Sequence, residues 1–429
     1  MDFIIFIPFI LMLLSIAIFP MIAENFWGKN RNKLIVSLVL GIPTAIWLLV
    51  NGMGTALEDS IIFDYIPFII LLGSLFVITG GIFIDANLEA KPKNNLLILA
   101  VGGILASFMG TTGAAMLLIR LLLHTNRERK RNVHIVLFFI AIVANCGGLL
   151  TPLGDPPLFM MYLRGVDFFW FLSLLKPWLF INGMLLLLFY IFDTYHWKRE
   201  SEEVKKMEIQ NKTPLVIKGK LNFVWLLVVI LTVAFINPNN FQFMNEFKPA
   251  LFLRDIIMIV VAILSIITTS KKYREANSFN WEPMKEVAFL FFGIFITMVP
   301  VLSFLKNNAE TININSPASF YFITGALSSF LDNTPTAVTF YTLAKSVFSN
   351  SIISGEIVAG IPAIIMEAIC LGAVAFGSMT YIGNGPNFMV KSIAEQDGIK
   401  MPQFFQYMIK FSLIIILPVL ILTKLLFIN

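Results

Sequence analysis

The chain has few of the residues that build soluble enzymes and disulfide-bonded proteins. Of its 429 residues, 13% are charged, three are histidine and two are cysteine. The cysteines, Cys146 and Cys370, both lie within apolar segments, so the sequence suggests no disulfide framework. It also has no CxxC, Walker or HExxH motif and no Ser/His/Asp arrangement, which leaves no nucleophile–base pair or metal cluster for catalysis. We therefore predict neither an enzyme nor a bound cofactor.

Apolar residues are abundant and make up 58% of the chain. Runs of about twenty of them recur from end to end, long enough to cross a hydrocarbon core of about 30 Å. The first run follows Asp2 with no basic region or A-x-A site, so we expect a retained span and not a cleaved signal. These runs predict an all-α integral membrane protein surrounded by the lipid bilayer. The net charge of +5 lies mostly in loops and indicates orientation, not a nucleic-acid partner.

The positions of Lys and Arg predict which side each loop faces, because basic loops stay in the cytoplasm. The basic loops are 28–33, 89–93, 124–132, 196–220 and 271–275, and the loops poor in Lys and Arg are 58–64, 237–247 and 307–316. This distribution places the N- and C-termini outside the plasma (inner) membrane. The segment 96–123 lies between two basic loops, so it must enter and leave from the cytoplasm. We predict a re-entrant hairpin with its tip at Thr111.

Two short stretches recur along the chain. "SFMGTTGAA" at 107–115 matches "SFLDNTPTA" at 329–337, an offset of 222, and "LGDPPLFM" ending at Met160 matches "IGNGPNFM" ending at Met389, an offset of 229. Each stretch places Gly or Pro, which disfavour helix, beside polar residues in an oily segment. Each half then holds five spans and one hairpin, and because five is odd the halves have opposite orientations. Inverted repeats with discontinuous helices are typical of secondary transporters, which bind their substrate at the breaks.

The repeat sets the predicted boundaries. The first repeat covers 1–195, with three spans, the cytoplasmic hairpin 96–123, the broken span 135–163 and the span 168–194. A cytoplasmic linker covers 196–221. The second repeat covers 222–429, with spans at 222–237, 253–269 and 285–304, the external hairpin 318–346, the broken span 357–391 and the last span 404–427. An alternative stays open, in which ordinary Pro and Gly kinks and a chance match produce the same pattern.

Four polar clusters are expected to converge where the hairpin tips meet the broken spans. They contain Thr111 and Thr112; Asp332, Asn333 and Thr334; Asn145, Thr151 and Asp155; and Ser378, Thr380, Asn384 and Asn387. Such oxygen-rich sets suit hard cations, and carboxylates inside a membrane usually mark ion or proton pathways. We therefore predict that Na⁺ binds at Asp155 and Asp332. In the alternative interpretation, each Asp only caps the new helix that starts near Pro156 or Pro335.

Other charged residues near the spans are secondary candidates. Glu367 lies within the second broken span and is a candidate for a proton relay. Arg120, Arg164, Asp193 and Lys345 fall near segment ends, where snorkelling to the interface explains them. His134 begins a span beside a basic loop, which favours a structural role.

The tips and breaks together resemble the ion transporter superfamily, which includes divalent anion/sodium symporters, citrate transporters, arsenite efflux carriers and NhaD-type sodium/proton antiporters. The tips read Gly110-Thr111-Thr112 and Asp332-Asn333-Thr334, and the breaks read Asp155-Pro156-Pro157-Leu158 and Asn384-Gly385-Pro386-Asn387. The resemblance covers nearly the whole chain and implies a homodimer that works by an elevator motion. In the dicarboxylate branch the tips and breaks are neutral, whereas here one tip and one break each contain an Asp. In this respect the chain is most similar to the NhaD-type branch. The first tip, however, lacks the Asp-Asn pair that this branch often carries.

The sequence therefore favours a Na⁺/H⁺ antiporter that exchanges cytoplasmic sodium for protons through these Asp residues. The alternative is a sodium- or proton-coupled symporter of citrate or another organic anion, because helix N-termini pointing into the site favour an anion. In either case the hairpins and broken spans are expected to form the moving domain, and the first three spans of each repeat the scaffold.

Overall fold

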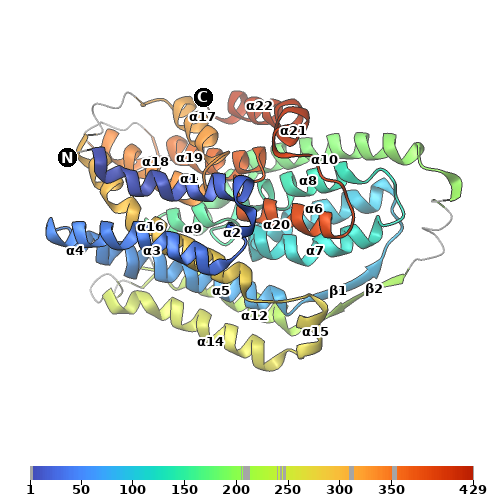
Figure 1. Ribbon diagram of the computed structural model, residues 1–429, viewed down its shortest axis with the longest axis horizontal. Coiled ribbons are helices and arrows are strands. Elements are labelled where there is room, and N and C mark those ends of the chain that lie inside the picture. Colours follow the sequence, from blue (N-terminus) through green and yellow to red (C-terminus); the bar gives the residue numbers. More distant parts are fainter. Residues whose placement is uncertain are drawn as a thin grey trace.

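The computed structural model describes residues 3–428 except 204, 206–212, 239, 242–243, 245–247, 309–313 and 350–354. This part of the chain is mostly helical (Figure 1). Seven of its helical segments are long and apolar enough to cross a membrane: Asn30–Val50, Gly54–Gly80, Pro92–Met109, Val133–Leu150, Phe169–Lys198, Glu282–Asn308 and Phe404–Phe427. Four shorter apolar segments accompany them: Ile4–Pro20, Thr111–Thr125, Leu221–Phe235 and Ala363–Met379.

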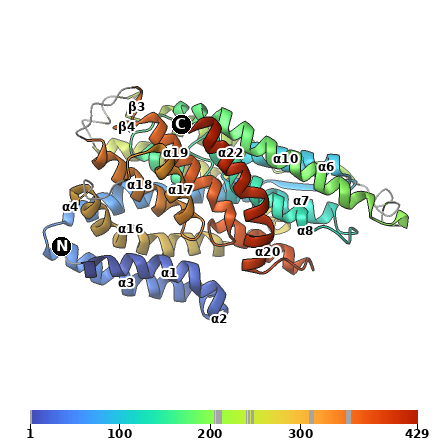
Figure 2. The same ribbon diagram turned by 90° about the horizontal axis from the view of Figure 1, so that it is seen from above.

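One group of helices comes from the first three predicted spans of each half. Its members are α1 (Ile7–Ile22), α3 (Asn30–Val50), α4 (Gly54–Glu58), η2 (Asp59–Tyr65), α5 (Ile66–Gly80), α12 (Leu221–Phe235), α14 (Phe252–Thr268) and α16 (Glu282–Asn308). α16 packs against α1 and α3, and α14 packs against α5 and α12. In Figure 2, α1, α3 and α16 run side by side.

α14 shows how this group meets its surroundings. The helix buries Asp255 and Ser265 and exposes Ile256, Ile263 and Ile267. A soluble helix has the reverse pattern, with its apolar residues turned inward. An apolar outer face and a polar inner face are expected where the outside is lipid and polar groups need protein partners.

Two helical hairpins form the centre of a second group. They are α6 (Pro92–Met109) with α7 (Thr111–Thr125), and α17 (Pro317–Ser328) with α18 (Asn333–Val347). They fall on the segments 96–123 and 318–346 for which the sequence predicts hairpins. In the first, the chain reverses at Gly110 alone, whose φ of 81° and ψ of 148° suit glycine only.

Two further segments are interrupted helices. The first consists of α8 (Val133–Ile142), η3 (Cys146–Leu150) and α9 (Pro156–Leu163), and the second of α19 (Ala363–Ala375), η7 (Phe376–Met379) and α20 (Gly385–Gln396). Glycine is required at both breaks because the backbone passes close to itself. A Cβ on Gly154 would lie 2.0 Å from the carbonyl oxygen of Gly148, and one on Gly383 would lie 2.5 Å from that of Gly377. The two breaks therefore share one backbone contact that no side chain allows.

The second group is completed by α10 (Leu175–Lys198), which packs against α6, α8 and α22. α22 lies along the upper edge of the molecule in Figure 1, on the far side from α14. The remaining helical elements are η1 (Phe3–Phe6), α2 (Glu24–Trp27), η4 (Phe169–Leu174), η5 (Lys248–Leu251), α15 (Lys271–Ala276), α21 (Phe404–Tyr407), η8 (Met408–Ile416) and α22 (Leu417–Phe427).

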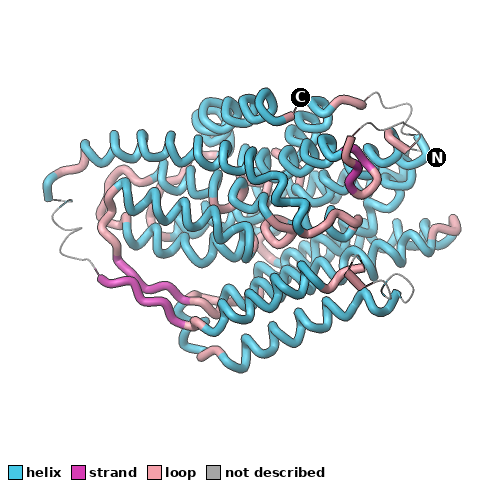
Figure 3. The backbone as a smooth tube through the Cα atoms, turned by 180° about the vertical axis from the view of Figure 1, so that it is seen from behind, coloured by secondary structure: helices cyan, strands magenta, loops and turns pink. Residues whose placement is uncertain are grey.

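Two small β-ribbons accompany the helices and are not part of the predicted all-α fold. β1 (Phe83–Asn87) pairs antiparallel with β2 (Thr213–Lys218), and β3 (Ile357–Val358) pairs with β4 (Ile361–Pro362). Figure 3 shows the β1–β2 ribbon at one end of the molecule. β2 lies in the predicted linker 196–221, where Val216 and Ile217 favour an extended strand.

Candidate functional site

Four helices begin around one cavity where the two groups meet. α7 begins at Thr111, α18 at Asn333, α9 at Pro156 and α20 at Gly385. The cavity has a volume of about 100 Å³, which is room for several water molecules. On the hairpin side its wall is formed by residues 109–113, 153–154, 156, 332 and 384–386. The opposite wall is apolar and comes from α5 and α16.

Asp155 lies at the centre of the polar cluster and is 1% exposed. Its Oδ1 accepts hydrogen bonds from Thr111 Oγ1 (2.7 Å) and Asn384 Nδ2 (3.2 Å), and its Oδ2 accepts one from Asn333 Nδ2 (2.9 Å). These donors come from the first tip, the second break and the second tip, so one carboxylate joins both halves. α9 begins at the next residue, yet the Asp155 side chain makes no capping hydrogen bond to it. Asp155 thus occupies the N-cap position of α9, but its carboxylate bonds the tips and the second break instead of the helix N–H groups, so it is more than a cap.

The amides of the second break extend this cluster to Asn145. Asn384 Nδ2 also donates to Asn145 Oδ1 (3.2 Å), and Asn145 Nδ2 donates to Asn387 Oδ1 (2.7 Å). Asn387 Nδ2 donates to the backbone carbonyls of Gly377 (2.8 Å) and Thr380 (2.9 Å). The carbonyl groups freed by the break thus receive a buried side-chain donor, as buried backbone groups require.

Asp332 lies on the cavity wall and is partly exposed to it. Its Oδ1 accepts the Thr334 backbone N–H at 3.0 Å, so Asp332 does cap α18. Thr112 lies on the same wall. The residues that line the cavity include this carboxylate and neither lysine nor arginine.

Two serines that were not among the predicted site residues attach the breaks to the tips. Thr151 Oγ1 donates to the carbonyl of Ser107, and Thr380 Oγ1 donates to the carbonyl of Ser329. The two serines are 222 residues apart and the two threonines are 229 residues apart, which are the two offsets of the sequence match. The same Ser–Thr contact therefore occurs in both halves. Ser107 and Ser329 are the first residues of the matched stretches, and this shared position is the signal that identifies them.

Two predicted site residues lie apart from the Asp155 cluster. Ser378 Oγ donates to the Ala375 carbonyl (2.5 Å) inside η7, and the Ser378 carbonyl accepts from Tyr407 (2.6 Å). Glu367 is half-buried on α19 and forms no hydrogen bond or ion pair to the described residues. Among the described residues, neither side chain forms a hydrogen bond to the tips.

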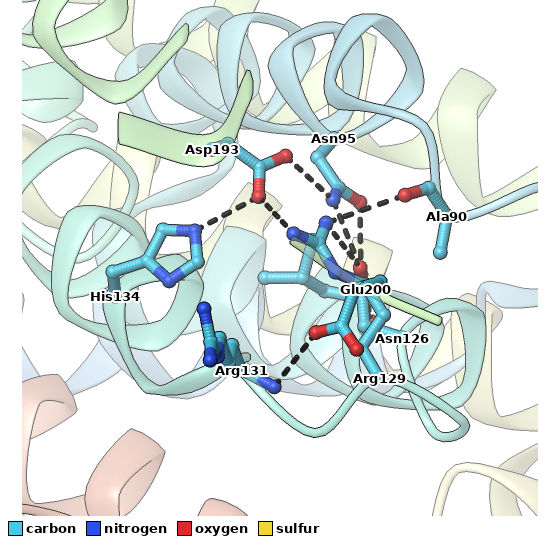
Figure 4. A network of polar contacts seen from close by, with 9 residues as sticks. Ala90, Asn95, Asn126, Arg129, Arg131, His134, Asp193 and Glu200 are labelled. Atoms are coloured by element: carbon cyan, nitrogen blue, oxygen red, sulfur yellow. Dashed lines mark hydrogen bonds and ion pairs between the residues drawn. The ribbon is translucent and has the colours of Figure 1, made fainter. Parts of the chain in front are cut away.

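A second buried polar network, at the far ends of α6 and α7, corrects the prediction for Asp193 (Figure 4). The Asp193 side chain is 0% exposed, and its Oδ1 lies 2.6 Å from Arg129 Nη2 and 2.8 Å from His134 Nε2. Asn95 Nδ2 donates to Asp193 Oδ2 (3.1 Å) and to Asn126 Oδ1 (2.8 Å). Asp193 is therefore a buried ion-pair partner that does not snorkel, because the loop before α8 turns Arg129 inward. The network joins the base of the first hairpin to α8 and α10.

Two arginines near segment ends also have specific partners. Arg164 Nη1 and Nη2 donate to the two carboxylate oxygens of Asp64, at 2.5 Å and 2.7 Å. Arg120 Nη1 donates to Ser278 Oγ at 2.8 Å. The Arg164–Asp64 pair joins the end of α9 to η2, so it connects the two groups of helices.

Comparison with known protein families identifies a relationship over nearly the whole chain. A family model described as "Putative citrate transport" matches residues 1–428. This range includes both hairpins, both breaks and all the residues of the Asp155 cluster. No curated protein matches the chain.

Proposed function

We propose that this chain, which belongs to that citrate transport family and is a multi-pass membrane transporter, carries citrate or a related organic anion together with Na⁺ or H⁺. The family match supports the anion. The chemistry of the cavity supports the coupling to a cation.

The observation that carries this proposal is the convergence of four helix N-termini on a cavity that also holds a carboxylate. Each N-terminus presents about half a positive elementary charge, so together they offer an anion about two positive charges. Asp155 and Asp332 cancel this charge when both are ionised. A Na⁺ ion or a proton on either carboxylate restores a positive potential. The anion therefore binds best after the cation, which couples the two fluxes.

In this proposal the two carboxylates take the cation, with Thr and Asn oxygens completing its shell. Thr111, Asn333 and Asn384 hold Asp155, while Asp332 and Thr112 face the cavity. Among the described residues, no group of three or more His, Cys, Asp or Glu could hold a metal ion. A singly charged ion held by one carboxylate and neutral oxygens suits such a site better than a divalent ion, which prefers several charged ligands.

We also propose that the two halves are inverted repeats that move by an elevator motion in a homodimer. The Ser–Thr contacts at offsets 222 and 229 and the matching Gly–Gly contacts at the two breaks support the repeat. The cavity supports the motion, because the hairpin tips line one wall of it and α5 and α16 line the other. In this arrangement the hairpins and breaks move against the helices of the first group. The basic loops lie in the cytoplasm and both termini lie outside.

A Na⁺/H⁺ antiporter is the second candidate, and a specific observation favours it. The cavity wall holds a carboxylate and no Lys or Arg, so no fixed cationic side chain pairs with a bound anion there. Two intramembrane Asp residues alone would suffice to exchange Na⁺ for H⁺.

Purified protein in liposomes with a pH gradient and a pH-sensitive dye separates the two functions, with acid inside to test exchange of sodium for protons and acid outside to test citrate uptake with protons. Sodium, citrate and succinate are added separately and in pairs, and uptake of labelled citrate is followed in parallel. Asp332→Asn keeps the shape and the cap but cannot titrate. Asp167→Asn is its matched control, because exposed Asp167 also accepts a backbone N–H, from Phe169 (2.8 Å), outside the cavity.

Citrate uptake that needs Na⁺ or a proton gradient, and that is lost in Asp332→Asn but kept in Asp167→Asn, is the expected result. Loss of the pH gradient on adding sodium alone, with no citrate uptake, would replace symport by antiport. Transport that is intact in Asp332→Asn would remove the carboxylate from either mechanism.

A further inference from the structure

A second, larger cavity of about 510 Å³ lies between the two groups of helices. Its wall is formed by η2 and the start of α5, by the end of α9, by residues 237–238 after α12 and by the start of α14. It shares no lining residue with the cavity at the hairpin tips, which touches α5 from Phe68 to Phe76. Exposed residues on its wall, Asp59 and Gly165, connect it to the surface.

Two arginines line this cavity, and one of them is fully engaged by a partner. Arg164 is held by Asp64 through two hydrogen bonds of 2.5 Å and 2.7 Å. Such a bidentate pair satisfies both the charge and the planar fork of a guanidinium. Arg164 therefore has little to offer a ligand.

Arg254 is different because only part of its guanidinium is used. Its Nε lies 3.3 Å from Asp255 Oδ1, and the Tyr162 hydroxyl also interacts with the guanidinium. The guanidinium carbon lies 5.5 Å from the ring centres of Phe159 and Tyr162, which fix its plane. The side chain is 8% exposed. An arginine has five N–H donors, so this buried, oriented guanidinium with two partners keeps donors for the cavity that Arg254 lines.

We propose that this cavity is a second binding site, at which the Arg254 Nη groups bind a carboxylate group of a small organic anion. Two parallel N–H donors match the two oxygens of a carboxylate, and arginine is the residue suited to this geometry. The three carboxylates on the wall, Asp59, Asp64 and Asp255, outnumber the two arginines, so the Arg254 fork recognises its ligand by hydrogen-bond geometry and not by net charge. The choice of citrate as the probe rests on the proposed function, but the carboxylate chemistry does not.

The site has a place in transport because α9 connects the two cavities. α9 begins directly after Asp155 and ends one residue before Arg164. Its eight residues span about 12 Å at 1.5 Å per residue. An anion held at Arg254 is therefore close to the hairpin tips yet outside them. This arrangement suits a docking site that raises the local concentration of the anion before it reaches the tips.

Calorimetric titration of the full-length protein in detergent with citrate, at saturating Na⁺, tests the proposal. The wild type is expected to bind citrate in two steps, and Arg254→Gln is expected to weaken one of them about tenfold or more, as for a lost charge-assisted hydrogen bond. Arg120→Gln, an exposed arginine outside both cavities, is the matched control and should leave both steps unchanged. Asp332→Asn should affect only the other step.

Each outcome separates this proposal from the proposed function. Equal citrate binding by the wild type and Arg254→Gln would overturn the second site, whatever the transport result. A step that depends on Arg254 in a protein that does not transport citrate would keep the second site and reject the proposed function. If Arg254→Gln is not monodisperse, Arg254→Lys keeps the charge but loses the planar fork. Wild-type affinity in Arg254→Lys would then overturn the proposed geometry.

Discussion

Replacing Asp155 with Asn tests whether the buried carboxylate is needed for its charge or for its shape. In the native protein its two oxygens accept three hydrogen bonds, from Thr111, Asn384 and Asn333. An Asn at this position has one oxygen and one donor group. The Ser328 Oγ lies 2.6 Å from both Asn333 Oδ1 and the Ala373 carbonyl oxygen, and its single proton can go to Ala373, which lets the Asn333 amide turn. The turned Asn333 donates to Ser328 Oγ and accepts from the new amide group, so the new oxygen can still face Thr111 and Asn384.

This orientation keeps the three contacts at position 155. Thr111 and Asn384 still donate to the oxygen, and Asn384 Nδ2 also has the Ala144 carbonyl (3.1 Å) and Asn145 Oδ1 (3.2 Å) as acceptors. The main loss is the charge assistance of the hydrogen bonds, so we expect Asp155→Asn to lower the free energy of unfolding by only about 1–2 kcal/mol. Asp155→Leu removes the acceptors of both Thr111 and Asn333. Each unsatisfied buried donor costs about 1–3 kcal/mol, which makes this variant the less stable one.

The measurements are citrate uptake into liposomes and thermal stability in the same detergent for the wild type and both variants. Asp155→Asn should fold, stay nearly as stable as the wild type and lose cation-coupled transport. Asp155→Leu should lose both stability and transport. If Asp155→Asn were as unstable as Asp155→Leu, the hydrogen-bond assignment would be wrong. If Asp155→Asn transported normally, the charge of Asp155 would have no part in the mechanism.

Two other substitutions probe the framework around the site. Gly154→Ala places a Cβ 2.0 Å from the Gly148 carbonyl oxygen. A backbone atom cannot move aside as a side chain can, so we expect this variant to lose transport activity and to give less folded protein. Gly183→Ala, whose Cβ has no atom within 4 Å, is the control and should change neither transport nor yield. Asp193→Asn leaves the fully buried Arg129 without its charge partner, which should cost about 3–5 kcal/mol of stability, seen as a lower denaturation temperature in detergent.

The helices and the Asp155 cluster follow from sequence because their signals are local. Long apolar runs mark the spans, and Gly or Pro beside polar residues within such runs marks each break. The repeated "SF" stretch and the repeated "PNFM"-like stretch add a second signal, because equal motifs in equal contexts predict equal structures. Thr111, Asn333, Asn384 and Asp155 lie within these stretches, and the structure brings their side chains into direct contact.

The Asp193 network has no comparable local signal. Its members come from α6, the end of α7, the following loop, α8 and α10, and each residue alone looks like an ordinary charged or polar group near a span end. Only the tertiary fold shows that Arg129 turns inward and meets Asp193. The sequence does not predict the β1–β2 ribbon for a similar reason. Its two strands are 126 residues apart at Asn87 and Thr213, and neither strand shows a clear alternation of apolar and polar residues.

The two site carboxylates occupy different positions, and this difference indicates which one exchanges the cation. At the matched tip positions the chain has Gly110 and Asp332, and at the matched break positions it has Asp155 and Asn384, so each half contributes one carboxylate from a different element. Asp155 accepts hydrogen bonds from three donors that come from both halves. Breaking these bonds to bind an ion would disturb the contact between the tips. Asp332 accepts one backbone hydrogen bond and faces the cavity, where an ion can reach it. We therefore expect Asp332, of the two carboxylates that take the cation, to be the one that exchanges it with the cavity, while Asp155 keeps the contact between the tips.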